Sequence, residues 1–376
     1  MRIALLLLAA ALLFTIPGHG QKRARDYGIS IGVIPTGANN AITDVSGVMV
    51  GHTTLIRGDS VRTGVTVILP HGDGIFQQKV PSAVFVGNGF GKLAGSTQIN
   101  ELGNLETPIV LTNTLSVATA MEAVISYTLS QPGNEDVYSV NAVVGETNDS
   151  YLNDIRGRHV GVQDVLDAIK GAQAGPVAEG SIGAGTGTVC FGYKGGIGTT
   201  SRRLPENLGG YTIGVLVQTN FGGILQIDGV PVGEALGRFS FKDQLFNNVD
   251  GSCMIIVATD APLDHRNLER LAKRAFLGLG KTGGIVSHGS GDYVVAFSTH
   301  PGVRIAHQPD QKLVKQTVLH QNYTSPLFMA AIEATEEAII NSLFAATSVT
   351  GIMGHQVVPI PLDKVLSILK KYKRIK

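Results

Sequence analysis

The chain has 376 residues, 43% hydrophobic and 16% charged, which is enough apolar sequence for one large core or two moderate ones. Its net charge is +1, with acids and bases interspersed, which excludes the basic surface of a nucleic-acid-binding protein and a polybasic membrane patch. The 48 glycines exceed the usual share and follow no Gly-X-Y repeat, so they indicate tight turns and close backbone contacts. We therefore expect a small-molecule partner.

Residues 1–20 have the pattern of a secretory signal peptide. Arg2 precedes an apolar stretch at 3–16, which ends at Pro17 in a segment with small residues. A membrane anchor is the alternative, but a spanning helix needs about 18 or more apolar residues. We expect a periplasmic or secreted protein that has no stable membrane span once residues 1–20 are removed.

Short apolar segments predict strands, and most are apolar on both faces, as in a sheet covered on both sides. They lie at 48–51, 65–69, 83–86, 108–111, 142–144 and 211–217. Helical spacing appears at 116–129, 162–172, 263–277 and 326–343. Asp264 is the predicted N-cap of the third of these helices. Helices between groups of strands predict an α+β sandwich with residues 21–376 as one domain. The alternative, a doubly wound α/β domain, needs more alternation of helices with strands.

Three glycine-containing segments resemble phosphate-binding motifs but lack the required context. Residues 275–282 resemble a phosphate loop, yet they follow a helix instead of a strand, so Gly280 is interpreted as the end of that helix. The glycine triplets at 87–91 and 183–187 are spaced unlike a dinucleotide fingerprint. We interpret them as turns that bring the backbone close to another part of the protein.

The histidines and cysteines do not predict a metal site or a cofactor. Ten histidines are scattered without ligand spacing. His288 lies near Ser290 and Asp292, but no Gly-x-Ser-x-Gly motif is present, so support for another nucleophile is favoured over a triad centred on Ser290. Cys190 and Cys253 allow at most one disulfide, and their apolar surroundings favour two buried thiols.

The junction between Gly251 and Ser252 lies between a polar loop and the apolar segment 253–257. Composition alone favours a plain turn here. If the bond after Gly251 is cut, however, Ser252 carries both a hydroxyl nucleophile and a free α-amine that can act as its base. On a strand, Cys253 points away from Ser252.

The sequence 250–263 around this junction resembles the processing site of the L-aminopeptidase D-amidase/D-esterase and β-peptidyl aminopeptidase family. Further matching segments follow in order along the chain, at 42–52, 86–92, 111–114, 144–154, 183–187, 217–222 and 289–292. Members of that family cleave themselves before the nucleophile, and their two chains stay associated. The resemblance therefore implies a self-cleaved enzyme with chains 21–251 and 252–376 and with Ser252 as the new N-terminus.

The resemblance also implies roles for other residues. Asn220 corresponds to the oxyanion-hole asparagine, and Ser290 and Asp292 to the serine and acid that support Ser252. Glutamate is the acid in the β-peptidyl members, so Asp292 has a shorter reach. Glu146 is expected to bind the ammonium of the substrate.

Five further polar residues have secondary roles. Asn148, Asn113 and Asn88 are candidates for lining the substrate pocket or positioning the precursor bond. Asp154 and Asp260 are expected to cap or brace loops.

The fold implied by the resemblance is a four-layer αββα sandwich similar to N-terminal-nucleophile hydrolases but with different connectivity. The implied activity is removal of N-terminal residues, including β- or D-residues, from short peptides, amides and esters. The implied assembly is a homo-oligomer of processed heterodimers. The alternatives are an acyltransferase of the ornithine acetyltransferase type, which uses threonine at the cleavage site, and a non-enzymatic β-rich binding protein.

Overall fold

The computed structural model of the protein describes residues 22–242 and 251–375. The predicted signal peptide at 1–20 lies outside the described residues, as does the polar loop at 243–250 that precedes Gly251.

Two sheets form the centre of the molecule. The first has the strand order β1-β2-β6-β7-β4, and β6 and β7 are parallel. Its strands are β1 Met49–Arg57, β2 Val61–Leu69, β6 Ile109–Asn113, β7 Val143–Thr147 and β4 Leu93–Ala94. The second has the order β10-β11-β12-β13-β3-β14, with β5 also paired to β3. Its strands are β10 Ile197–Arg203, β11 Thr212–Asn220, β12 Ser252–Thr259, β13 Gly291–Ser298, β3 Gln78–Gly89, β14 Ile305–Ala306 and β5 Asn104–Leu105.

The remaining elements are two small hairpins and the helices. The hairpins are β8 Val189–Cys190 with β9 Tyr193–Lys194, and β15 Val349–Thr350 with β16 Gln356–Val357. The helices are α1 Ser96–Leu102, α2 Val117–Leu129, α3 Val162–Lys170, α4 Val232–Ala235, α5 His265–Lys281, α6 Ser325–Phe344 and α7 Leu362–Lys371. Among the described residues, no helix combines the length and the hydropathy needed to cross a membrane.

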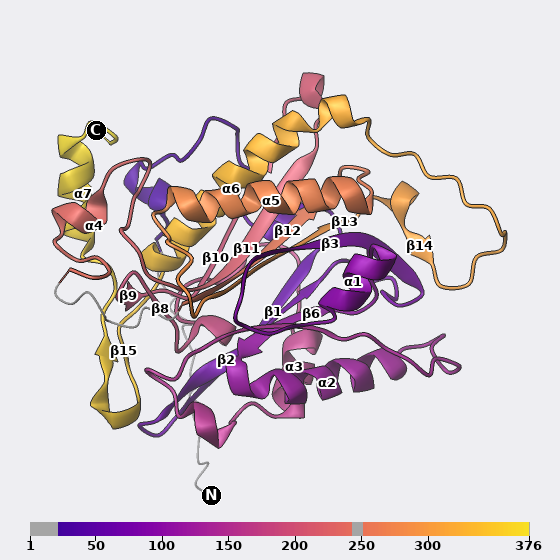
Figure 1. Ribbon diagram of the computed structural model, residues 1–376, viewed down its shortest axis with the longest axis horizontal. Helices are drawn as coiled ribbons and strands as arrows, with labels where there is room; N and C mark the ends of the chain where they lie inside the picture. Colours follow the sequence, from indigo (N-terminus) through magenta and orange to yellow (C-terminus); the bar gives the residue numbers. More distant parts are fainter. Residues whose placement is uncertain (1–21, 243–250, 376) are drawn as a thin grey trace, which may run out of the picture.

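The helices cover the outer faces of the two sheets, so the molecule has four layers (Figure 1). Helices α2 and α3 pack on the first sheet, and α5 and α6 pack on the second. Three apolar clusters fill the spaces between successive layers. This arrangement confirms the predicted αββα sandwich.

Strand β12 shows why its sequence is apolar at almost every position. Met254 and Ile256 belong to the cluster between the sheets, whereas Cys253 and Ile255 belong to the cluster under α5 and α6. Cys253 therefore faces away from the inter-sheet side, as predicted from alternation along a strand. A Cβ at Gly145 would lie 2.4 Å from Met254 Cε, so glycine there lets the sheets approach closely.

The sequence predicted most of these elements. Each predicted strand and helix is present, and Asp264 caps α5 by accepting a hydrogen bond from the Asn267 N–H at 3.0 Å. Helix α5 continues through Gly280 to Lys281, so the prediction that Gly280 ends this helix is wrong. The glycine with a left-handed φ is Gly283, and Lys281 pairs with the buried Glu336 of α6 at 2.5 Å.

Candidate active site

Ser252 is the first residue of β12, in the middle of the second sheet. The antiparallel register of β11 places Asn220 opposite Ser252, and the parallel register of β13 places Gly291 beside it. Ser252 is buried, as is Asn220. Two segments that are far apart in sequence thus meet Ser252 at one end of the same sheet.

The carbonyl before Ser252 receives two hydrogen bonds. The Ser252 hydroxyl donates to Gly251 O at 2.6 Å, and the Gly291 N–H donates to the same oxygen at 3.2 Å. The Gly291 N–H is also 3.4 Å from Ser252 Oγ. These donors polarise the Gly251 carbonyl and keep the hydroxyl beside it.

Gly291 can occupy this position because its own neighbour is a glycine. A Cβ at Gly291 would lie 2.6 Å from Gly91 Cα and 2.7 Å from Gly91 N, both backbone atoms that cannot rotate away. The Tyr293 hydroxyl holds the segment between β3 and β4 in place by donating to Gly91 O at 2.7 Å. Of the glycine triplet at 87–91, Gly91 makes the predicted close backbone approach, whereas Gly87 and Gly89 lie in strand β3, so the prediction of a turn is wrong there.

The Asn220 amide has a fixed orientation. Its Oδ1 accepts a hydrogen bond from the Val189 N–H at 3.0 Å, which leaves the Nδ2 group as the donor for another acceptor. Strand register pairs Asn220 with Ser252, so the two residues share one end of the sheet. The oxyanion role of Asn220 stays a prediction.

Ser290 and Asp292 are buried on either side of Gly291. Burial raises the pKa of Asp292 to about 6, and the Ser290 hydroxyl and the Cys253 N–H oppose that rise only in part. Neither the Ser290 hydroxyl nor the Cys253 N–H makes a hydrogen bond of good geometry to Asp292. Both Asp292 oxygens and Ser290 Oγ lack hydrogen-bond partners among the described residues. The carboxylate is thus poorly stabilised in the uncut chain.

The register pairs Asp292 with Cys253 and not with Ser252. Strand alternation assigns Asp292 to the side of the sheet under α5 and α6, whereas Tyr293 and Met254 face the first sheet. Consistent with this placement, burial raises the pKa of the Cys253 thiol, and the charge of Asp292 adds to that rise. Asp292 is therefore close to the backbone of the Ser252–Cys253 segment.

Glu146 lies near the end of β7 and is buried. Its carboxylate accepts hydrogen bonds from the Lys92 N–H at 3.0 Å and from the Thr114 hydroxyl. Its Oε1 is 3.2 Å from the Cβ position of Gly91, and Gly291 Cα is 3.0 Å from that same position. The fold therefore brings this carboxylate close to the glycine pair beside Ser252.

The three secondary asparagines differ in position. Asn148 lines a pocket, whereas Asn113 caps a short 3-10 turn through the Leu115 N–H at 3.1 Å and donates to Thr63 Oγ1 at 2.8 Å. Asn88 binds the turn before β13 through the carbonyls of Ser287 and Ser290, each at 2.8 Å. The structure does not place Asn113 or Asn88 in that pocket's wall.

The pocket lined by Asn148 has a volume of about 670 Å³ and extends from Asn220. Phe191 and Phe221 form part of its wall and pack edge to face, with ring centroids 5.1 Å apart. Gly251 touches this wall, since its Cβ position is 3.0 Å from Phe221 Cα. The pocket is thus next to the Gly251–Ser252 bond, and its wall combines aromatic side chains with polar and basic ones such as Arg238.

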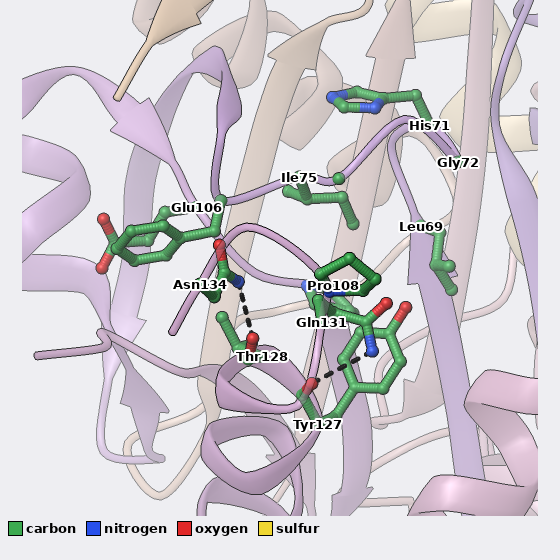
Figure 2. Close-up of a pocket in the computed structure, with 13 residues that line it drawn as sticks. Leu69, His71, Gly72, Ile75, Glu106, Pro108, Tyr127, Thr128, Gln131 and Asn134 are labelled. Atoms are coloured by element: carbon green, nitrogen blue, oxygen red, sulfur yellow. Dashed lines mark hydrogen bonds between the residues drawn. The ribbon is translucent and has the colours of Figure 1, made fainter. Parts of the chain in front are cut away.

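A second pocket, of about 40 Å³, lies at the opposite end of the first sheet (Figure 2). It is lined by Leu69 at the end of β2 and by Pro108 just before β6, whereas the site is near Asn113 at the other end of β6. Its walls are held by local bonds such as the Asn134 Nδ2 donation to Thr128 O at 2.6 Å. Its volume is far below the roughly 300–1,000 Å³ of a typical ligand pocket, so we do not assign the substrate to it.

Other expectations concern cysteine, aspartate and metal ligands. Cys190 and Cys253 are buried and free, as predicted. Asp154 accepts from His159 at 2.9 Å, and Asp260 accepts from the Thr212 N–H at 2.7 Å, so both brace local structure. Within the described parts of the chain, no three His, Cys, Asp or Glu side chains gather as metal ligands do.

The sequence did not reveal two groups of this site. The Val189 N–H that orients Asn220 and the Gly291 N–H that reaches Gly251 O are backbone donors, so side-chain identity does not mark them. The glycine triplet before β8 and the Gly-Asp pair at 291–292 are the nearest signals, because glycine permits close backbone approaches.

A four-layer αββα sandwich with a serine at the start of a central strand defines the class of N-terminal-nucleophile hydrolases. The solved L-aminopeptidase D-Ala-esterase/amidase of Ochrobactrum anthropi, described as a prototype serine aminopeptidase and a variant of that fold, is 35% identical, with a TM-score of 0.86. The likeness covers 94% of this chain and 99% of that one. The PH0078 protein of Pyrococcus horikoshii OT3 is 47% identical, with a TM-score of 0.87 over 94% of this chain and 100% of that one.

Sequence comparison agrees. Residues 40–357 match peptidase family S58. The chain is also 41% identical to the β-peptidyl aminopeptidase BapA of Sphingosinicella microcystinivorans, over 98% of this chain and 97% of that protein. The chain belongs to peptidase family S58. It is an enzyme, a serine aminopeptidase of the N-terminal-nucleophile type, and not the non-enzymatic binding protein considered above.

Proposed function

We propose that this aminopeptidase is exported, cleaves its own chain between Gly251 and Ser252, and then removes N-terminal β-amino acid residues from short peptides, amides and esters. The observation that carries the proposal is the pair of donors on the Gly251 carbonyl, from Ser252 Oγ at 2.6 Å and Gly291 N at 3.2 Å. The preference for β-residues is supported by the relative whose name describes it as a β-peptidyl aminopeptidase.

Self-cleavage starts when Ser252 Oγ attacks the Gly251 carbonyl carbon. The Gly291 N–H stabilises the resulting oxyanion. The C–N bond then breaks, the proton given up by the Ser252 hydroxyl passes to the Ser252 nitrogen, and an ester joins Gly251 to Ser252 Oγ. Water hydrolyses this ester, which leaves a carboxylate on Gly251 and a free α-amine on Ser252. The two products are the chains that end at Gly251 and begin at Ser252.

In turnover, Ser252 Oγ attacks the first carbonyl of the substrate and forms an acyl-enzyme, which water hydrolyses. The Ser252 α-amine titrates near neutrality and removes the hydroxyl proton. The Asn220 Nδ2 donor stabilises the tetrahedral anion. Asp292, whose oxygens have no hydrogen-bond partner among residues 22–242 and 251–375, gains the new ammonium as a neighbouring opposite charge.

Recognition of the free N-terminus falls to Glu146. A buried carboxylate that already accepts two hydrogen bonds is held rigidly and keeps oxygen lone pairs for an ammonium. The pocket from Asn220 to Phe191, which has aromatic and polar walls, accommodates the side chains of a short peptide. We further propose that processed heterodimers assemble into a homo-oligomer outside the cytoplasm.

The test is electrophoresis and N-terminal sequencing of the purified protein, with hydrolysis of β-alanyl-p-nitroanilide as the activity. We expect two chains, the smaller beginning Ser252-Cys253-Met254, and S252A should give one chain without activity. Ser298→Ala is the control, because Ser298 is a buried serine at the far end of β13. A single uncut chain with full activity would contradict self-processing.

Export is tested separately. Cell fractionation should find the processed protein outside the cytoplasm, and the larger chain should begin after residue 20. A cytoplasmic protein with residues 1–20 intact would contradict export while leaving the peptidase chemistry in place.

A further inference from the structure

Lys194, at the end of β9, is fully buried. Its Nζ donates to Gly185 O at 2.8 Å and to Gly195 O at 2.7 Å. Among the residues that the structure describes, no carboxylate lies within ion-pair distance of this ammonium. Burial lowers the pKa of Lys194 to about 7. Burying a cation that is held only by carbonyls costs free energy of folding. The two carbonyls that Lys194 binds therefore indicate its role in the structure.

One of these carbonyls belongs to the glycine triplet at 183–187, which forms a 3-10 turn and has no part in the mechanism above. The turn is tightly enclosed. A Cβ at Gly185 would lie 2.5 Å from Ile197 N, and a Cβ at Gly187 would lie 2.9 Å from Asp149 Cβ. Lys194 therefore fixes a turn that adjoins Asp149, the neighbour of the pocket residue Asn148.

Lys194 is also connected to Asn220 along two routes. In the β8–β9 hairpin, Lys194 pairs with Val189, and the Val189 N–H orients Asn220 Oδ1 at 3.0 Å. On the other side, Gly196, two residues after Lys194, binds Thr219, the residue before Asn220. The Thr219 N–H donates to Gly196 O at 2.9 Å. The ammonium thus holds the backbone that borders Asn220.

We propose that Lys194 is a positioning residue for Asn220: by binding the Gly185 and Gly195 carbonyls, its ammonium fixes the β8–β9 hairpin so that the Val189 N–H keeps the Asn220 amide aimed at the oxyanion. This inference rests on the proposed role of Asn220. Without the ammonium, the two carbonyls lose their donor and the hairpin relaxes. Asn220 can then turn its amide, and stabilisation of the tetrahedral anion is lost while substrate binding is not.

The test compares K194M, N220A and the double variant on β-alanyl-p-nitroanilide, with kcat referred to the cleaved fraction on a denaturing gel. Loss of an oxyanion donor costs about 100- to 1000-fold in kcat, which is the result expected for N220A. K194M should lower kcat by at least about tenfold and change KM less than about twofold. In the N220A background, K194M should lower kcat by less than about twofold further. Both substitutions remove the same stabilisation of the oxyanion by Asn220, so their effects should not add.

Lys79→Met is the matched control. Lys79 is also largely buried, but it pairs with Glu106 at 2.5 Å at the far end of the sheets, so K79M should leave kcat unchanged. If K194M and N220A lower kcat independently, or if K194M raises KM as much as it lowers kcat, Lys194 does not act through Asn220. If N220A leaves kcat unchanged, the proposed oxyanion role itself fails, and this inference fails with it.

Lys194→Gln covers the case in which K194M does not fold. Glutamine keeps a neutral donor for one carbonyl, so K194Q should have a kcat between those of the parent and K194M with KM unchanged. If N220A blocks self-cleavage entirely, the test depends on K194M or K194Q alone. A lower kcat with KM little changed would then support the positioning role of Lys194. An unchanged kcat in a folded, cleaved K194Q protein overturns the proposal.

Discussion

Gly291 and Ser252 lie side by side on the parallel strands β13 and β12, with the Gly291 N–H 3.4 Å from Ser252 Oγ. The same N–H is 3.2 Å from Gly251 O. One backbone donor therefore serves both the nucleophile and the carbonyl that it is proposed to attack. Its position depends on β13 approaching Gly91 closely, which makes this contact directly testable.

Gly291→Ala should slow self-cleavage at least about tenfold and destabilise the protein by roughly 1–3 kcal/mol. The reason is that the added Cβ would lie 2.6 Å from Gly91 Cα, so β13 must shift and carry the N–H with it. The appearance of the smaller chain on denaturing gels and the free energy of unfolding measure the two effects. Cleavage at the parent rate would show that this N–H is not required.

Gly280→Ala is the control for that variant. Gly280 lies in α5 with open space around its Cβ position. Alanine there should stabilise the helix by roughly 0.5–1 kcal/mol and leave cleavage unchanged.

Glu146→Gln should lower kcat/KM for β-alanyl-p-nitroanilide by roughly 10- to 100-fold, since a charge-assisted hydrogen bond to the substrate ammonium is replaced by a neutral one. The 3-hydroxypropionyl analogue, which has no ammonium, should be affected much less. The ratio of the two kcat/KM values measures the recognition of charge.

Glu106→Gln is the matched control, because Glu106 is also buried and also receives a backbone N–H, from Asn141 at 2.8 Å. It lies at the opposite end of β6, so E106Q should keep the parent ratio. If E146Q lowers kcat/KM equally for both substrates, Glu146 does not bind the substrate ammonium.

Asp292→Asn should make the uncut S252A protein more stable above pH 6 and leave it nearly unchanged below pH 4. Burial raises the pKa of Asp292 from 3.8 to about 6. Between these pH values the folded chain holds a proton that the unfolded chain has released, so stability falls as pH rises. At pH 7 the difference is roughly 3 kcal/mol.

Denaturant unfolding of S252A and of S252A with D292N at pH 4, 5, 6 and 7 measures this difference, in which the other titrating groups cancel. Asp136→Asn, at an exposed position, serves as the control and should give no such trend. A difference between D292N and its parent that does not change with pH would mean that Asp292 is not a strained carboxylate in the uncut chain.

Much of the fold was predictable because its signal is local. Strand β12 is apolar on both faces, and its alternate residues fill two different clusters, so the covered sheet could be inferred from its composition. The end of α5 was misjudged by one residue, because Gly280 stays helical and the glycine with a left-handed φ is Gly283, two residues past the helix end. Several glycines follow one another here, and the sequence does not specify which of them ends the helix.

The site was predictable in part. The resemblance along the chain indicated Ser252, Asn220 and Glu146, and the fold brings the first two together by strand register and the third through Gly91. Asn113 was also a pocket candidate, but its amide is used in a cap and in a bond to Thr63. Whether a polar side chain faces substrate or backbone depends on neighbours that its own sequence segment does not specify.

The sequence by itself determined the kinds of elements, the layered sandwich and the serine after Gly251, because these depend on apolar periodicity and on residue types at short spacing. Only the tertiary structure decided which groups surround that serine. It placed Asp292 in register with Cys253, aimed the Gly291 N–H at the Gly251 carbonyl, and buried Lys194 against the carbonyls beside Asn220. These relationships depend on strand register and on backbone atoms, and they arise only when segments distant in sequence pack together.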